Sequence, residues 1–219
     1  MSPAQGGYGD PNMVGRGGSR SQDAPRSHGD GGVVGTRIIV AYGFWIFLIS
    51  DIIMFSAFFA AYAVLSSATA GGPSGRQLFD LQNTAIETGL LLTSSFTCGL
   101  ASIAADVRNP RWFYAAMTAT FVLGAGFIGL ELHELAGFVA RAAGPDRSAF
   151  LSSFFALVGC HGLHVSIGLL WLLTMMAEVF AKGFRDDIQR RILCFALFWH
   201  ALDIIWVALF TVVYLLGVA

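Results

Sequence analysis

The sequence predicts an all-α, polytopic membrane protein with five transmembrane helices. Five long apolar stretches take up most of the 219 residues, and each exceeds the roughly 20 residues that cross a bilayer. The composition agrees, because only 12% of the residues are charged, whereas a soluble domain has about 25%. The stretches do not alternate apolar and polar residues as barrel strands do, so we expect helices. The expected spans are residues 38–65, 84–105, 112–136, 150–181 and 192–218.

The chain divides into a tail and one membrane domain. Residues 1–35 contain ten of the 26 glycines and few large apolar side chains, which is typical of a disordered segment. The first span is too long for a signal peptide and has an acid in its middle, so we expect it to be a permanent helix. We therefore predict a disordered cytoplasmic tail over residues 1–35 and a five-helix membrane domain over residues 36–219.

The connections between the spans predict the orientation. Those at 66–83 and 137–149 contain Gly71-Gly72-Pro73 and Gly144-Pro145-Asp146, which are turn signals. Ten of the 13 Lys and Arg residues precede the first span or lie in the connections 106–111 and 182–191. Basic residues favour the cytoplasmic side, so we expect the N-terminus inside and the C-terminus outside. The net charge of −1 gives no indication of a nucleic-acid partner.

Ionisable side chains inside the spans are the candidate functional residues. A charged group at mid-bilayer costs about 2.5–3.5 kcal/mol on insertion scales, so such residues persist where they face protein, water or a partner. The candidates are Asp51, Glu87, Glu131, Glu134, His161, His164, His200 and Asp203.

The position of these residues along their spans predicts which of them meet. At about 1.5 Å per residue, Asp51 lies about 20 Å and Asp203 about 17 Å from the basic ends of their spans, and His164 falls at a similar depth. His200 and Asp203 are three residues apart and share a helix face. We expect a buried polar network of Asp51, His164, His200 and Asp203. No Lys or Arg lies in the core of any span, so we expect Asp51 to be protonated.

Two interpretations of the histidines remain open. They form either a functional site, such as a proton relay, a metal or haem site or a lipid headgroup site, or a hydrogen-bond network that fixes helix register. For the three glutamates, which lie nearer the outer ends of their spans, the preferred interpretation is solvation at the interface or a local hydrogen bond. Histidine placement disfavours haem ligation by this chain, and Glu131-Leu-His133-Glu134 has the wrong spacing for a di-metal carboxylate site. We predict no catalytic residue, metal site or cofactor site on the chain.

Three motifs are similar to those of a known family. They are Gly43-Phe-Trp-Ile-Phe-Leu-Ile-Ser-Asp51, Cys160-His-Gly-Leu-His-Val165 and Phe198-Trp-His-Ala-Leu-Asp-Ile-Ile-Trp206. Together they resemble the hallmark segments of subunit III of the haem-copper respiratory oxidases, over residues 36–219. Gly144-Pro-Asp-Arg-Ser-Ala-Phe150 and Phe154-Phe-Ala-Leu-Val-Gly159 most resemble the five-helix subunit of bacterial bo-type ubiquinol oxidases.

The resemblance implies a non-catalytic subunit of a proton-pumping terminal oxidase in the inner membrane of a bacterium, active in aerobic respiration. In the family, subunit I carries the haems and copper, and subunit III packs on it and supports assembly, lipid binding and proton uptake. The implied partners are subunit I, the other oxidase subunits and membrane lipids, with bound phospholipid expected. Asp51 occupies the position of a carbodiimide-reactive Glu in many members, and we carry over no reactivity to the shorter acid.

Other functions stay open at this stage. The first alternative is subunit III of a bacterial cytochrome c oxidase. More remote alternatives are an independent membrane transporter or proton channel and a small haem-b anchor. A transporter usually has broken helices at mid-depth, and no proline lies in any span to break one.

Overall fold

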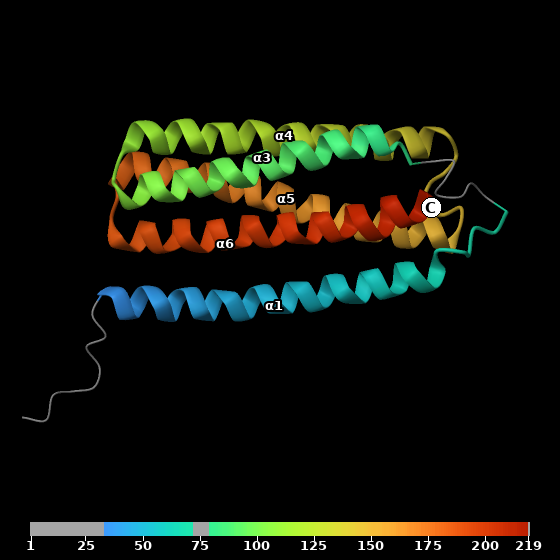
Figure 1. The fold of residues 1–219 in the computed structure, drawn as a ribbon, viewed down its shortest axis with the longest axis horizontal. Helices are drawn as coiled ribbons and strands as arrows, with labels where there is room; N and C mark the ends of the chain where they lie inside the picture. Colours follow the sequence, from blue (N-terminus) through green and yellow to red (C-terminus); the bar gives the residue numbers. More distant parts are fainter. Residues whose placement is uncertain (1–32, 72–78, 219) are drawn as a thin grey trace, which may run out of the picture.

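The computed structural model describes residues 33–71 and 79–218, and these form five long helices (Figure 1). The helices are α1 (Val33–Leu65), α3 (Leu81–Asp106), α4 (Pro110–Ala140), α5 (Ala149–Lys182) and α6 (Asp186–Leu209). A π-helix, η1 (Phe210–Leu215), and a final short turn, α7 (Leu216–Val218), continue α6. The predicted tail lies outside the described residues, apart from residues 33–35, which begin α1.

All five helices are long and apolar enough to cross a membrane, which confirms the five predicted spans. Two of them begin at side chains that cap the helix. The Asp80 carboxylate accepts hydrogen bonds from the backbone N–H of Gln82 and Asn83, and the Ser148 hydroxyl accepts one from the N–H of Leu151. Such caps satisfy N–H groups that have no partner in the first turn. Each therefore fixes where a span starts after its connecting loop.

Helices α3, α4, α5 and α6 form a bundle, and α1 packs along α5 and α6 at its side (Figure 1). Within the described chain, 11% of the most apolar part of α1 is buried, against 61% for α6 with η1. The buried side chains of α1 include Leu48, Phe55 and Tyr62, which are seven residues apart and so lie on one face. Helix α1 is thus attached through a single narrow stripe.

The indole of Trp199 on α6 forms the centre of the bundle. Its Nε1–H donates to the Ser94 hydroxyl of α3 at 3.0 Å. A Cβ atom at Gly124 of α4 would lie 3.0 Å from this ring, and one at Gly168 of α5 would lie 2.9 Å from it. Both positions therefore need the small residue, since side chains this close pack at native density.

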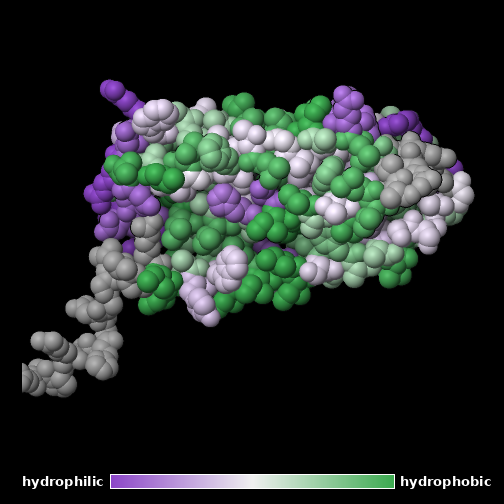
Figure 2. Space-filling model, viewed as in Figure 1, coloured by the Kyte–Doolittle hydropathy of each residue, from purple (hydrophilic) through white to green (hydrophobic). Residues whose placement is uncertain are grey.

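Polar and apolar side chains are divided along the length of the molecule. Figure 2 shows apolar side chains over the middle of the visible face and hydrophilic ones gathered at the end where α1 begins. This is the distribution of a membrane-spanning bundle, in which the lipid-facing surface is as apolar as the core.

Candidate functional site: the buried polar groups of the bundle

Three glutamates and a tyrosine lie close together near one end of the bundle. Glu87 is in the second turn of α3, Glu131 and Glu134 are near the end of α4, and Tyr214 is in η1. The Tyr214 hydroxyl donates to Glu134 Oε2 at 3.3 Å, and Glu131 lies within electrostatic range of Glu87 and Glu134. We call these four residues the acid cluster.

Glu87 and Glu131 of the acid cluster are enclosed by the protein, and Glu134 is half-buried. Glu87 is 0% exposed and Glu131 is 2% exposed, so water at the interface solvates neither group, whereas the local hydrogen bond of the preferred interpretation is present for Glu87. The Asn83 amide donates to Glu87 Oε1 at 3.2 Å. Glu87 Oε2 and both Glu131 oxygens are buried and have no hydrogen-bond partner among the described residues. Among the described residues, Glu87 therefore has one hydrogen-bond donor and Glu131 has none that would offset the cost of burying a charge.

A seam of small hydroxyl side chains joins α3 to α6. The Trp199 indole N–H bonds the Ser94 hydroxyl, and the Trp206 indole N–H donates to Thr88 Oγ1 at 3.1 Å. Ser95 Oγ lies 3.0 Å from His200 Nδ1. Hydrogen bonds between helices help to hold them together in hydrocarbon, where burial of apolar surface drives no association. These contacts fix the register of the antiparallel α3 and α6.

The four residues of the predicted network fall into separate groups. His200 and Asp203 lie beside Ser95 on the α3–α6 side. His164 Nδ1 lies 2.8 Å from the Cys160 carbonyl oxygen of its own helix, and Asp51 of α1 is near the Cys160 thiol. Among the described residues, no hydrogen bond or ion pair joins the first pair to the second. The structure therefore brings together two pairs and does not form a single network.

His161 is the most deeply enclosed of the candidate histidines. It is 0% exposed, and its Nε2 lies 3.3 Å from the Leu202 carbonyl oxygen of α6. Its ring packs against Phe127 of α4 and Trp206 of α6, at centroid distances of 5.8 and 5.1 Å. The imidazole thus joins three helices, while its Nδ1 is buried without a hydrogen-bond partner among the described residues.

The polar side chains of α3 and the role of Tyr214 were not predicted from the sequence. The signal for the seam is present, because Trp199 and Trp206 are seven residues apart and Thr88 and Ser94 are six apart on the antiparallel partner. Tyr214 had no such signal. A continuous α-helix was expected through this region, whereas the π-helix turns its residues to another face.

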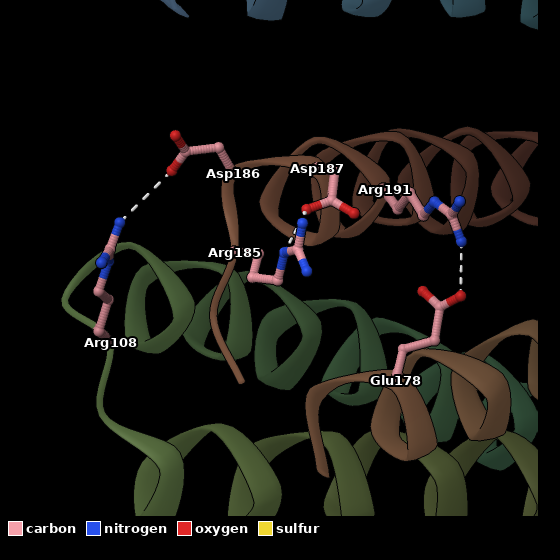
Figure 3. A network of polar contacts seen from close by, with 6 residues as sticks. All are labelled: Arg108, Glu178, Arg185, Asp186, Asp187 and Arg191. Carbon is pink, nitrogen blue, oxygen red and sulfur yellow. Dashed lines mark hydrogen bonds and ion pairs between the residues drawn. The ribbon is translucent and has the colours of Figure 1, made fainter. Parts of the chain in front are cut away.

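The opposite end of the bundle has exposed ion pairs (Figure 3). Arg108, in the loop after α3, lies 3.4 Å from Asp186 at the start of α6. Arg191 of α6 pairs with Glu178 of α5 at 2.5 Å. The first pair ties the α3–α4 loop to the start of α6, and the second joins α5 to α6. The two ends of the molecule therefore differ, with exposed pairs at one and buried acids at the other.

The described residues contain no group of three or more His, Cys, Asp and Glu side chains that could hold a metal ion. Carboxyl and phenol groups such as those of the acid cluster form hydrogen bonds and can gain and lose protons.

Comparison with known proteins places the chain in a family. Residues 28–218 match the family model described as cytochrome c oxidase subunit III. The chain is 51% identical over 176 residues to the cytochrome bo(3) ubiquinol oxidase subunit 3 of Pseudomonas aeruginosa, which covers 80% of the chain and 84% of that protein. It is 41% identical to the quinol oxidase subunit 3 of Bacillus subtilis, over 80% of the chain and 86% of that protein.

A cytochrome c oxidase is also among the similar proteins. The cytochrome c oxidase subunit 3 of Bacillus sp. (strain PS3) is 40% identical over 179 residues, covering 80% of the chain and 84% of that protein. Relatives of both oxidase types thus match nearly the same length of the chain, and the family model spans the five described helices and the acid cluster. The chain belongs to the cytochrome c oxidase subunit III family.

Proposed function

We propose that this chain is subunit III of a bacterial bo-type ubiquinol oxidase. The observation that carries the proposal is the 51% identity to such a subunit from Pseudomonas aeruginosa, with 48% to that of Pseudomonas putida, each over 80% of the chain. The cytochrome c oxidase subunit of the Bacillus strain is less similar, at 40%. The electron donor of the complex is therefore ubiquinol.

Within such a complex the chain is a non-catalytic subunit, and its partners are the other oxidase subunits. Haem and copper belong to subunit I, which this chain supports in assembly and in proton uptake. Large apolar side chains exposed along α1, such as Ile39 and Ile53, face lipid or a neighbouring subunit. The complex lies in the inner membrane of a bacterium, with the N-terminus inside and the C-terminus outside.

A phospholipid binds where α1 meets α5 and α6 at the basic end of the bundle. A cavity of about 390 Å³ lies there. Its residues are Val40, Phe44, Trp171, Asp187, Arg190, Arg191 and Cys194. The apolar side chains suit an acyl chain, and the half-buried Arg190 suits the phosphate, because guanidinium groups bind phosphate through paired hydrogen bonds.

The lipid site is tested by removing its cation. We expect Arg190→Gln to reduce the phospholipid that remains bound through detergent purification, measured as phosphorus per complex. Arg111→Gln, at an exposed arginine on the same end of the molecule, is the control and retains it. Equal phosphorus in the two variants would exclude Arg190 as the headgroup ligand.

The candidate acids and histidines have a supporting role. Asp51 and His164 stabilise the contact of α1 with α5, and His200 and Asp203 stabilise that of α3 with α6. His161 and the three glutamates, Glu87, Glu131 and Glu134, hold the interior of the bundle. We assign no catalytic step to any of them. The support that this chain gives to proton uptake is assigned to this set of residues.

Purification in mild detergent tests the assignment. A tag on this chain is expected to co-purify a haem-containing subunit I, and the complex should consume oxygen with ubiquinol much faster than with reduced cytochrome c. The chain separated from its partners should show no haem absorbance. Preferential oxidation of cytochrome c would identify the other oxidase type, and a chain that purifies without any oxidase subunit would reject both.

A further inference from the structure

The carboxyl group of Glu131 is the polar group least explained by the fold. The residue is 2% exposed, and no described group donates a hydrogen bond to either of its oxygens. Because the chain itself encloses the group, neither lipid nor another subunit reaches it in the assembled complex. Buried oxygens of this kind require a donor, and a proton on the carboxyl group itself supplies one.

The surroundings of Glu131 favour a bound proton. Glu87 and Glu134 lie within electrostatic range and would repel a negative charge on Glu131. Asp80 adds a further negative charge beside Glu134, and Arg141 is the cation near it. Neither Glu87 nor Glu131 has an ion pair among the described residues. If all three glutamates were ionised, few positive charges would offset their negative charges. Sharing protons among the three carboxyl groups relieves this repulsion.

The fold makes room for this arrangement. Glu131 Oε1 lies only 2.7 Å from the position that a Cβ atom would take at Gly162 of α5. Glycine therefore lets the carboxyl group lie against the backbone of α5. The π-helix adds a donor, because it places the Tyr214 hydroxyl 3.3 Å from Glu134 Oε2. π-helical turns occur often at functional sites.

The acid cluster is within reach of one end of the bundle. Glu87 lies about 9 Å along α3 from Leu81, and Glu131 lies about 14 Å along α4 from Ala140. The half-buried Asn83 bonds Glu87, and the exposed Asp80 begins the same helix. A graded series of polar side chains thus leads from the surface to the buried acids.

We propose that the acid cluster is a proton-binding site, in which Glu131 takes up a proton and shares it with Glu87 and Glu134. On uptake, one carboxylate oxygen binds the proton of a hydronium ion and releases a water molecule, and no other bond changes. The proposal rests on the proposed function, in which this chain supports the handling of protons by the oxidase, and it names the residues that bind the proton. It does not depend on which electron donor the complex uses.

Infrared difference spectra of the intact purified complex, recorded between acidic and alkaline pH, test the site. The wild-type complex should show a C=O band of protonated carboxylic acid that changes with pH and moves in D2O. Glu131→Gln keeps the shape of the side chain but cannot titrate, so it should remove one component of that band. Asp146→Asn, at an exposed acid in the loop before α5, should leave the band unchanged.

A second variant separates the site from a packing effect. Tyr214→Phe removes the donor to Glu134 and should shift one component of the band without removing any. Where Glu131→Gln does not accumulate, Glu87→Gln replaces it in the same comparison. Spectra that superimpose on wild type in the glutamine variants would overturn the proposal, as would a band that depends on the identity of the added cation and not on pH. Oxidase membership is decided separately by co-purification.

Discussion

Trp199 shows how a single residue can organise this bundle. It lies on α6, bonds Ser94 of α3, and packs its ring into the space left by Gly124 of α4 and Gly168 of α5. In hydrocarbon, helices associate through close packing and hydrogen bonds rather than through burial of apolar surface. A residue that combines both kinds of contact with three other helices therefore contributes strongly to their association.

Gly168→Ala should destabilise the bundle. The added methyl group would lie 2.9 Å from Trp199 Cζ3 and 3.1 Å from Phe198 Cε1, and both rings are buried. Overpacking of this kind costs about 1–3 kcal/mol. The control is Gly159→Ala on the same helix, where no atom lies within 4 Å of the new Cβ. Thermal unfolding in detergent should show a lower midpoint for Gly168→Ala alone, and equal midpoints would contradict the close approach of α5 to α6.

The hydrogen bond of Trp199 can be measured by a double-mutant cycle. Trp199→Phe and Ser94→Ala each remove one partner of the 3.0 Å bond, so the double variant should lose less stability than the sum. We expect a coupling of about 0.5–1.5 kcal/mol in reversible unfolding in mixed micelles. Trp112→Phe, at a tryptophan that is 70% exposed, should show no coupling to Ser94→Ala. An additive cycle for Trp199 would mean that the bond contributes nothing net.

At the scale of whole elements, α1 differs from the other helices. Its contact with the bundle runs through Leu48, Phe55 and Tyr62, while most of its other apolar side chains face outward. Phe55 is central in this stripe, because its ring meets both His164, at a centroid distance of 5.3 Å, and His161, at 6.4 Å. The element is thus held by few side chains and should be the first to separate.

Phe55→Ala should loosen α1 selectively. Replacing a buried Phe by Ala costs about 3–5 kcal/mol in a soluble core, and the loss here should be smaller because lipid can fill part of the space. Hydrogen exchange of the chain in nanodiscs should rise in α1 and stay low in α3 to α6. Ile53→Ala, at a side chain that is 65% exposed, should leave exchange unchanged. A uniform increase across all helices would show that α1 is an integral part of the bundle.

The sequence predicted the helices themselves better than it predicted which side chains of each helix face the interior of the bundle. Length and hydropathy predicted all five spans, since a bilayer imposes a length that few other structures share. Depth matching of Asp51, His164 and Asp203 did not predict contact, because equal depth says nothing about the rotation of each helix about its axis. Glu131 illustrates the same limit. Its distance from the helix end suggested water, while its direction, toward Gly162 of α5, determines its burial.

For the molecule as a whole, the two ends carry different chemistry. Arg108, Arg185 and Arg191 form exposed pairs at one end, and the acid cluster is buried near the other (Figure 3). Such exposed pairs add little stability individually, so the basic end serves orientation more than folding. With the proposed orientation, the acid cluster lies in the outer half of the membrane.

Cysteine labelling at two exposed positions tests this orientation. Asp146 lies before α5 and Lys182 at its end, so the helix separates them by about 50 Å. On a background without Cys98, Cys160 and Cys194, Asp146→Cys should react with an impermeant maleimide in intact spheroplasts, because the positive-inside rule puts this loop outside. Lys182→Cys should react only after the membrane is opened. Its reaction then shows that the cysteine at this position is accessible to the reagent. The reverse pattern would invert the molecule, and the acid cluster would then exchange protons with the cytoplasm.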